Sequence, residues 1–428
     1  MDNDIKSAKI FQNKYLVLSL FIIFFVVIRS LHFPESLNFS FDQGHGFTRI
    51  LEMWRNKEIT LVGPASSISA DNKQLLQGSI IYYFTLVFAL LGKFDPVASS
   101  YVFMLFSSLG IIPLYLGMKR LANYKAAILM AVIYTLLPMF IDYTLFFFGP
   151  NFLIPLSTVL IYLMGLYKTK SKNIHLFLIF AYVGILMQFH YQVAIILIAL
   201  FFYYFLESKR KHWIPLSGMT KPLLIMIGGF CVGFSPMILF ELKNQFYNLN
   251  VIKNYLFSAK QHSGTPFEIL PHRYLAISIF SLSIIGVYFK KYISNVLITI
   301  IAVTLIIIDL CIYLPKPSHG FGMSPDWNYL MEKKAYEVIK KQDVKNYNIV
   351  NHIYDNLSVV IKFHLRKDEV KINYDDYYHN DHLYVISKSE YVFEDPAYEL
   401  NTFIPNKLVG RWKLNETYNL YLFKRIKN

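Results

Sequence analysis

Two aspartates near the ends of apolar segments are the first candidates for acid–base chemistry. Asp42 follows the first apolar segment, in FSFDQGHGFTRILEMW, and Asp142 ends a later one, in PMFIDYTLFFFGPNF. Acidic side chains are costly at a membrane margin and often functional there. Two carboxylates at one margin could divide base and orienting roles or coordinate a divalent cation. Spacing alone favours simpler interpretations, a helix cap for Asp42 and an interfacial carboxylate for Asp142.

Further polar residues stand at the ends of other apolar segments. Glu241 and Lys243 occur in GFSPMILFELKNQF, and Arg273 precedes a later apolar run. Cations at this depth could pair with a lipid phosphate, or they could be ordinary interfacial side chains. Gln188 and His190, in LMQFHYQVAII, could bind sugar hydroxyls or phosphate oxygens. A helical turn that satisfies its own backbone explains them equally well.

Composition indicates that membrane helices must position these residues. The 428-residue chain is 55% hydrophobic and only 16% charged, with long apolar runs in its first 313 residues. Its formal net charge of +14 comes largely from short basic clusters between those runs, which is the positive-inside pattern. No basic face or recognition motif supports nucleic-acid binding. The chain has no P-loop, GxSxG, HExxH or CxxC motif, which argues against ATP hydrolysis, serine hydrolysis and zinc-protease chemistry.

The charge clusters predict an all-α polytopic membrane domain over residues 1–313 with about nine spanning helices. The expected spans are 15–31, 97–118, 126–144, 152–167, 174–189, 191–206, 221–241, 273–289 and 292–313. A tenth apolar segment, 76–92, is predicted to lie along the interface, because only then do all the basic clusters face the cytoplasm. The N-terminus is then cytoplasmic and the C-terminal residues extracytoplasmic.

Two other regions have their own patterns. In the first external loop, residues 46–56 should form an amphipathic interfacial helix, and residues 60–67 should form a tight turn with hydroxyls. Residues 314–428 begin with the breaker-rich PKPSHG and predict a small extracytoplasmic α/β domain. Its expected helices are 325–342 and 355–366, and its expected strands are 346–353, 383–387, 406–414 and 417–424. The last two strands should pair as a hairpin.

Several blocks in order resemble one family. These are the FDQ segment, ITLVGPASS, a G-x-x-x-YY run, FFFGPNFLIP, MQFHYQ and PMILFELKNQF. Over roughly residues 15–275 the chain resembles the GT-C membrane glycosyltransferases, especially bacterial relatives of protein O-mannosyltransferases and of the aminoarabinose transferase that modifies lipid A. The resemblance implies a phospholipid carrier-dependent glycosyltransferase that moves a hexosyl or pentosyl group from a polyprenyl-phosphate donor to an acceptor outside, with inversion.

Site roles follow from that resemblance. The first-loop acid of the protein mannosyltransferases is a base on the acceptor hydroxyl, which implies this role for Asp42; Asp142 matches the second acid. The expected donor-phosphate ligands are Arg49, Arg55, Lys73, Lys243 and Arg273. The expected substrate-binding residues are Gln43, His45, Gln188, His190 and Glu241. Any divalent cation would be held by Asp42 and Asp142, and no other cofactor is implied.

The chain also departs from the family pattern. His45 and Gly46 stand where bacterial relatives often have an Arg-Asp pair, and Gln43 stands where the eukaryotic mannosyltransferases have a second acid. The lysine that some relatives have just before the short hydrophobic segment has no clear match, since Lys73 is only nearby. These departures put the phosphate contacts and any metal in question. The expected partners are membrane lipids and a lipid-linked sugar in a bacterial-type plasma membrane, with the acceptor (protein, lipid or glycan) open. The alternatives are a lipid-linked sugar flippase or a polysaccharide polymerase or ligase.

Overall fold

The structure is a computed structural model that describes residues 14–212, 220–257, 270–370, 376–395 and 397–426. The chain forms two compact units. The helical unit contains residues up to 31 with 59–87 and 101–314, and the mixed unit contains residues 32–58, 88–100 and 315–428. The sequence predicts a single boundary between residues 313 and 314, whereas the mixed unit also takes in two segments of the N-terminal half of the chain.

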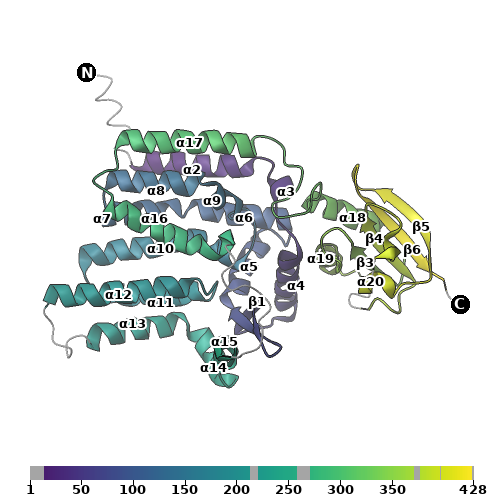
Figure 1. The fold of residues 1–428 in the computed structure, drawn as a ribbon, viewed down its shortest axis with the longest axis horizontal. Helices are drawn as coiled ribbons and strands as arrows, with labels where there is room; N and C mark the ends of the chain where they lie inside the picture. The colour runs from purple at the N-terminus through teal and green to yellow at the C-terminus, as the bar shows by residue number, and fades with distance from the viewer. Residues whose placement is uncertain (1–13, 213–219, 258–269, 371–375, 396, 427–428) are drawn as a thin grey trace. The chain divides into compact units, whose positions relative to one another are not determined.

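Apolar helices build the helical unit, and the long ones run roughly parallel to one another (Figure 1). Its helices are α2 (Lys14–Ser30), α7 (Ile111–Leu121), α8 (Tyr124–Leu136), α9 (Pro138–Asp142), α10 (Gly149–Lys170), α11 (Asn173–Met187), α12 (Val193–His212), α13 (Thr220–Gly233), α14 (Ser235–Lys243), α15 (Tyr247–Phe257), η2 (Pro271–Tyr274), α16 (Leu275–Tyr288) and α17 (Asn295–Tyr313). Helices α5 (Ile80–Leu91) and α6 (Pro96–Ser108) are divided between the two units.

Three helices in the described part of the chain are long and apolar enough to cross a membrane. They are Pro96–Leu121, which joins α6 and α7, Gly149–Lys170 and Asn295–Tyr313. A fourth span would form if α13 and α14, bent by 74° at their junction, count as one. The other apolar helices are shorter than the roughly 20 residues that a straight crossing needs, so the expected nine crossings and the interfacial placement of 76–92 stay predictions. The N-terminal basic cluster and the side chains at 209–211 lie outside the described residues.

A β-hairpin stands where the sequence predicted a tight turn. Residues 60–67 were expected to turn, but most of them belong to β1 (Val62–Ala70), which pairs antiparallel with β2 (Lys73–Gly78). The turn is at Asp71 and Asn72, both with positive φ, which these residue types tolerate well. The prediction was wrong because Gly, Pro and Ser favour turns locally, whereas the partner strand that extends them is a separate segment.

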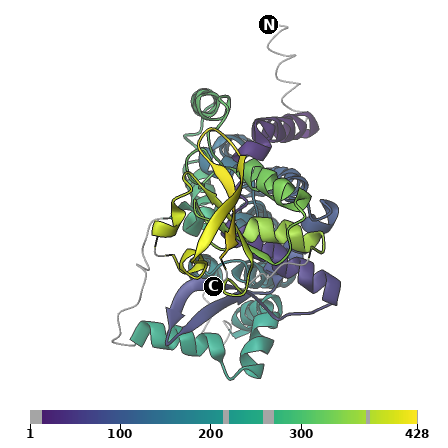
Figure 2. The same ribbon diagram turned by 90° about the vertical axis from the view of Figure 1, so that its right-hand side faces the viewer.

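The mixed unit contains a four-stranded sheet in the order β3-β4-β6-β5. Strands β3 (Tyr347–Asn351) and β4 (His382–Ser387) are parallel, and β6 (Asn419–Arg425) is antiparallel to both β4 and β5 (Asn406–Lys413). Its helices are α3 (Phe33–Ser36), α4 (Phe41–Asn56), α18 (Tyr329–Lys341), α19 (Val359–Lys367), η3 (Val392–Glu394) and α20 (Tyr398–Asn401). The last two strands pair as a hairpin, as the sequence predicts, and Figure 2 shows the sheet with helices beside it.

Alternating side chains give this sheet two buried faces. Ile349, Tyr384 and Ile386 pack on one face with residues of α18 and α19, including Ile339 and Leu365. The opposite face carries a separate cluster. Its buried members are Val350, Tyr377, Leu383, Val385, Val392, Leu400, Phe403, Tyr421 and Phe423. The sheet is therefore fixed on both sides, so the loops at its strand ends start from a rigid base.

Candidate functional site

Asp42 lies in the first turn of α4, and its neighbours rather than Asp42 itself cap the helix. Ser40 is the N-cap, and the Gln43 amide oxygen accepts from the Ser40 backbone N–H (3.2 Å) and hydroxyl (2.9 Å). Gln43 is accordingly buried. The Asp42 side chain is exposed and has no hydrogen-bond partner in the described part of the chain. The cap interpretation of Asp42 is thus excluded, while the substrate role of Gln43 stays a prediction.

The protein around Asp42 favours its neutral form. Loss of hydration raises the pKa of the Asp42 carboxyl, and the nearby His45 opposes that rise. The side chain remains exposed, which limits the loss of hydration. His45 lies one turn later on the same helix, and its ring packs edge-on against Phe41 with centroids 4.4 Å apart. The arrangement offers an accessible carboxyl whose proton affinity is above that of an ordinary aspartate.

A second carboxylate of the mixed unit lies within electrostatic range of His45. Asp355 is buried, and it accepts from the backbone N–H groups of Leu357 (3.1 Å) and Val359 (2.8 Å) at the start of α19. Burial raises the pKa of Asp355, and His45 acts to lower it. Asp355 was not a candidate from the sequence, where it reads only as the start of the helix expected at 355–366.

Close packing fixes α4 against α19. A Cβ added to Gly44 would lie 2.9 Å from Val359 Cγ1, so a larger residue there would push the helices apart. Phe47 meets Phe363 edge to face at 5.6 Å. Phe47, Ile50 and Leu51 are buried as the amphipathic pattern predicts, whereas Trp54 is 53% exposed. The first turn of α4 is therefore held by contacts within the mixed unit.

Both predicted phosphate ligands on α4 make contacts within the mixed unit. Arg55 donates to the backbone carbonyls of Arg366 (2.9 Å) and Lys367 (2.8 Å), which closes the C-terminal end of α19. Arg49 forms an ion pair with Glu58. These contacts explain the two arginines structurally, and their role toward a donor phosphate stays a prediction.

Gln188 lies where the helical unit packs backbone against backbone. The Gly78 N–H donates to the Gln188 carbonyl (3.0 Å), and a Cβ on Gly78 would lie only 2.3 Å from the Gln188 Cβ. The Gln188 amide donates to the Gly233 carbonyl (2.8 Å). Its oxygen is buried without a partner among the described residues. That unpartnered acceptor is what a bound hydroxyl or water would satisfy.

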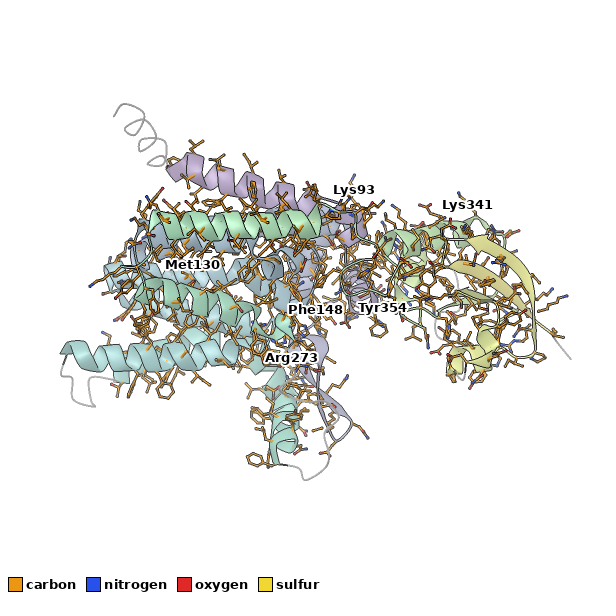
Figure 3. All side chains as sticks on the ribbon, turned by 45° about the horizontal axis from the view of Figure 1, so that its top comes forward. Lys93, Met130, Phe148, Arg273, Lys341 and Tyr354 are labelled. Atoms are coloured by element: carbon orange, nitrogen blue, oxygen red, sulfur yellow. The ribbon has the colours of Figure 1, made fainter. Side chains whose placement is uncertain are left out.

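His190 and Arg273 come together at the same end of this unit. The Gln192 backbone N–H donates to His190 Nδ1 (3.2 Å), and the Gln192 amide donates to the His272 carbonyl (3.2 Å). Burial lowers the pKa of His190 to about 4, with smaller effects from His272 and Arg273. His190 is therefore neutral at physiological pH, with Nε2 as its remaining donor. Figure 3 labels Arg273 and Phe148, whose ring meets that of His272 at 5.3 Å.

Glu241 has a structural partner. Its carboxylate accepts from the backbone N–H groups of Asn248 (3.1 Å) and Leu249 (3.2 Å), so it caps the N-terminal end of α15. The Asn248 side chain in turn accepts from the Leu76 N–H (2.8 Å), which attaches α15 to the β1–β2 hairpin. In the same region the Lys73 ammonium lies 5.9 Å from the Tyr247 ring centre, and Lys243 is exposed.

Asp142 belongs to a buried polar network between α2, α9 and α17. The Tyr313 hydroxyl donates to the Asp142 carboxylate (2.8 Å). Arg29 is 1% exposed and donates to the Thr144 hydroxyl (2.7 Å) and the Thr135 carbonyl (2.8 Å). The Arg29 charge acts on Asp142 and on the buried Asp309, whose oxygens have no hydrogen-bond partner among the described residues. Neither Arg29 nor Tyr313 is a candidate from the sequence.

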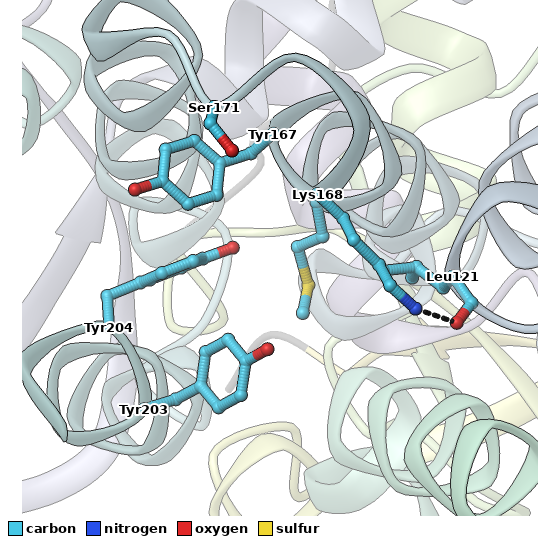
Figure 4. Close-up of a pocket in the computed structure, with 7 residues that line it drawn as sticks. Leu121, Tyr167, Lys168, Ser171, Tyr203 and Tyr204 are labelled. Atoms are coloured by element: carbon cyan, nitrogen blue, oxygen red, sulfur yellow. Dashed lines mark hydrogen bonds between the residues drawn. The ribbon is translucent and has the colours of Figure 1, made fainter. Parts of the chain in front are cut away.

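The helical unit also has a small pocket at the C-terminal end of α10. Figure 4 shows its tyrosines, Tyr167, Tyr203 and Tyr204, beside Lys168, whose ammonium donates to the Leu121 carbonyl (2.5 Å). That bond caps the C-terminal end of α7. The predicted topology puts this end in the cytoplasm, away from the end that carries His190 and Arg273.

No group of three or more His, Cys, Asp or Glu side chains suited to a metal ion occurs in the described ranges. Asp42 is in the mixed unit and Asp142 in the helical unit. A divalent cation shared by these two residues stays a prediction.

Comparison with known proteins connects part of the chain, mostly in the helical unit, to one family. Residues 79–240 match the family described as dolichyl-phosphate-mannose-protein mannosyltransferase. No curated protein matches the chain significantly. A crystal structure of the Archaeoglobus fulgidus oligosaccharyltransferase, in complex with zinc and sulfate, is similar at 13% identity and a TM-score of 0.41. The similarity covers 69% of this chain and only 39% of that one.

The family match confirms the resemblance to GT-C glycosyltransferases and the membrane character of the chain. Asp142, Gln188 and His190 lie inside the matched residues, together with FFFGPNFLIP and MQFHYQ. Asp42 and the ITLVGPASS block precede them. The match thus covers the second predicted acid, while the assignment of Asp42 depends on its own surroundings.

Proposed function

We propose that the chain is a membrane glycosyltransferase of the GT-C type, which its match to the mannosyltransferase family over residues 79–240 supports. It transfers a sugar from a polyprenyl-phosphate donor to an acceptor hydroxyl. The reaction takes place at the outer face of a bacterial-type plasma membrane, with inversion at the anomeric carbon. The N-terminus is cytoplasmic and the mixed unit extracytoplasmic. The acceptor is a hydroxyl of a protein, lipid or glycan.

The state of Asp42 is the observation that carries the proposal. A general base must be accessible to the acceptor and must not be occupied by a structural hydrogen bond. Asp42 is exposed, has no hydrogen-bond partner among the described residues, and has a raised pKa. Its helix is fixed by the packing of Gly44 on Val359. These features support a carboxylate that is held in place and ready to accept a proton.

The proposed step needs one proton transfer and one displacement. The acceptor oxygen attacks the anomeric carbon as its proton passes to Asp42, and the bond between that carbon and the phosphate oxygen breaks. The polyprenyl phosphate leaves with the bonding electron pair. Because the donor is already activated, the enzyme contributes mainly alignment and charge stabilisation.

The leaving phosphate requires hydrogen-bond donors and positive charge. Arg273 and the neutral His190 at one end of the helical unit support a role in holding the donor, since an arginine and an imidazole N–H can both donate to phosphate oxygens. The unpartnered oxygen of Gln188 suits a sugar hydroxyl. Lys73 and Lys243 are exposed and would contribute charge at a greater distance.

The test is sugar release from a panel of labelled polyprenyl-phosphate sugars, in membranes that contain the wild type or Asp42→Asn. We expect turnover of at least one donor and a loss of about 100-fold or more in the variant, the usual range for a general base. Asp343→Asn is the matched control, because Asp343 is an exposed aspartate of the same unit. It should keep the wild-type rate.

Two results would contradict the proposal. Turnover that Asp42→Asn leaves unchanged would remove Asp42 from the reaction. Protein-dependent movement of the labelled lipid across the bilayer, without sugar release, would instead establish a flippase. Buried charges such as Arg29 and Asp309 are a feature that transporters share, so the flippase assay belongs in the same experiment.

A further inference from the structure

A cleft of the mixed unit lies outside every site considered so far. Its volume is about 470 Å³. Its walls come from the segment before α18 and from the loops that follow β3 and β4, with Tyr418 from the end of the β5–β6 hairpin. The lining residues are Ser324, Pro325, His352, Ile353, Ser387, Lys388, Ser389, Tyr391, Val392 and Tyr418.

The position of this cleft in the sheet is one at which ligands bind. Strands β3 and β4 are parallel, and His352 and Lys388 are the first residues after their carboxyl ends. Crevices outside the carboxyl ends of parallel strands are the usual binding places of α/β sheets. The cleft volume also falls within the range of small-molecule sites, roughly 300–1,000 Å³.

Local hydrogen bonds shape the walls. The Ser389 N–H donates to the Ser387 hydroxyl (3.2 Å), and the Tyr391 N–H donates to the Ser389 hydroxyl (3.2 Å), so the loop after β4 is built from consecutive serine turns. On the opposite side, the Tyr418 hydroxyl donates to the Pro325 carbonyl (2.9 Å), and the Ser324 hydroxyl donates to the Ile353 carbonyl (3.3 Å). The cleft is thus formed by bonded loops.

The charged side chain that lines the cleft is Lys388, and the His352 ring beside it is already bonded to a carboxylate. His352 Nε2 lies 2.9 Å from an Asp395 carboxylate oxygen, and this bond lowers the pKa of Asp395. Lys388 is exposed, and its ammonium lies 5.5 Å from the Tyr418 ring centre. It forms no ion pair with a carboxylate in the described part of the chain. Lys388 therefore has charge available for an anionic group.

We propose that this cleft binds an anionic saccharide, one that carries a carboxylate or phosphate group. Lys388 pairs with the anionic group, and the serine hydroxyls and His352 bond to sugar hydroxyls. Tyr391, which is 72% exposed in the cleft, offers its ring face to the apolar side of a sugar. A peptide strand fits less well, because the cleft is at the strand ends and presents no sheet edge for strand addition.

This proposal goes beyond the proposed function and does not depend on it. Binding is measured without any donor, so its failure would leave sugar transfer by Asp42 untouched. Equally, a flippase or an inactive relative could still bind the saccharide.

The test is a binding titration of the purified full-length protein in detergent. The probes are a galacturonic acid trisaccharide and the neutral maltotriose, read by saturation-transfer NMR and calorimetry. We expect the acidic trisaccharide to bind more tightly than the neutral one. Lys388→Met should weaken the acidic probe about tenfold or more, the usual effect of losing a bond to a charged group, and leave the neutral one unchanged.

Tyr391→Ala should weaken both probes, because it removes the stacking surface that they share. The matched controls are Lys413→Met and Tyr398→Ala, exposed residues of the same unit that do not line the cleft, and both should bind like the wild type. Absence of binding by both probes would overturn the proposal. So would binding that neither cleft substitution changes, or equal affinity for the two probes in the wild type.

Discussion

The two aspartates that the sequence predicts to be catalytic have opposite surroundings. Asp42, in the mixed unit, is exposed and has no hydrogen bond among the described residues, and His45 acts on it electrostatically. Asp142, in the helical unit, is partly buried, accepts from Tyr313 at 2.8 Å and lies in the field of Arg29. An exposed, unbonded carboxylate can take a proton from a substrate at little structural cost. A carboxylate that several helices hold through hydrogen bonds and charge is one whose loss destabilises the fold.

This difference suggests how to distinguish structural from functional acidic residues at a membrane margin, namely by whether the protein itself supplies a hydrogen-bond or charge partner. Where the protein supplies the partner, as Tyr313 and Arg29 do, the acid is explained by structure. Where no partner is present, as at Asp42, a function outside the fold is the better explanation. The predictions that follow test this division.

The largest effect is expected from Arg29→Met, which leaves the buried Asp309 and Asp142 without their cation. Leaving a buried carboxylate without a compensating cation costs about 3–5 kcal/mol of unfolding free energy. Thermal unfolding in detergent measures the loss, with the partly exposed Arg49→Met as the matched control. Adding Asp309→Asn to Arg29→Met should recover part of it. Equal midpoints for the Arg29 and Arg49 variants would show that the network is not structural.

A third carboxyl, Glu332, extends the comparison to a fully buried acid. It accepts from Trp327 Nε1 (3.0 Å) and the Asn351 amide (2.8 Å), and burial raises its pKa to about 8. Because its pKa is higher in the folded than in the unfolded state, the protonated Glu332 carboxyl stabilises the folded protein. This contribution is fully present below the unfolded pKa of about 4.5 and is lost as pH rises through the folded pKa of about 8. Glu332→Gln should remove this loss, on the order of a few kcal/mol, from unfolding curves between pH 5 and 8. Identical pH slopes in both proteins would contradict it.

A smaller effect is expected from Tyr313→Phe, which removes the hydroxyl that bonds to Asp142. Loss of a hydrogen bond to a charged group should cost about 1.5–3 kcal/mol of stability. The matched comparison is Asp42→Asn, which breaks no bond and should stay within about 0.5 kcal/mol of the wild type. Sugar transfer should respond in the opposite order, with Tyr313→Phe close to wild type and Asp42→Asn inactive. A stable, inactive Tyr313→Phe would place Asp142 in the reaction instead.

The smallest effect is a shift in the pH dependence of transfer. A base must be deprotonated, so kcat/KM should fall as pH drops through the raised pKa of Asp42. The His45 charge lowers that pKa, and His45→Asn should therefore move the acidic limb to higher pH by less than about one unit. A limb that moves to lower pH, or does not move, would show that His45 does not act on the base.

Local patterns in the sequence determined several features directly. The strands expected at 346–353, 383–387, 406–414 and 417–424 all occur within a few residues of their predicted bounds. The helix expected at 46–56 is the C-terminal part of α4. The GT-C resemblance was also carried by short blocks that the family match confirms in part. Periodicity and order along the chain suffice for such features, because each depends on residues close together in sequence.

Tertiary structure decided which of the polar candidates have partners. Arg29 and Asp309 are 280 positions apart in the sequence, yet the Arg29 charge acts on Asp309 in the folded chain. The role of Glu241 as the cap of α15 likewise depends on the position of that helix in the fold. The first-loop helix joins the C-terminal residues in one unit because Gly44 lets it approach Val359. Hydrogen bonds and desolvation depend on distances through space. The sequence alone therefore does not distinguish a hydrogen-bonded carboxylate such as Asp142 from an unbonded, exposed one such as Asp42.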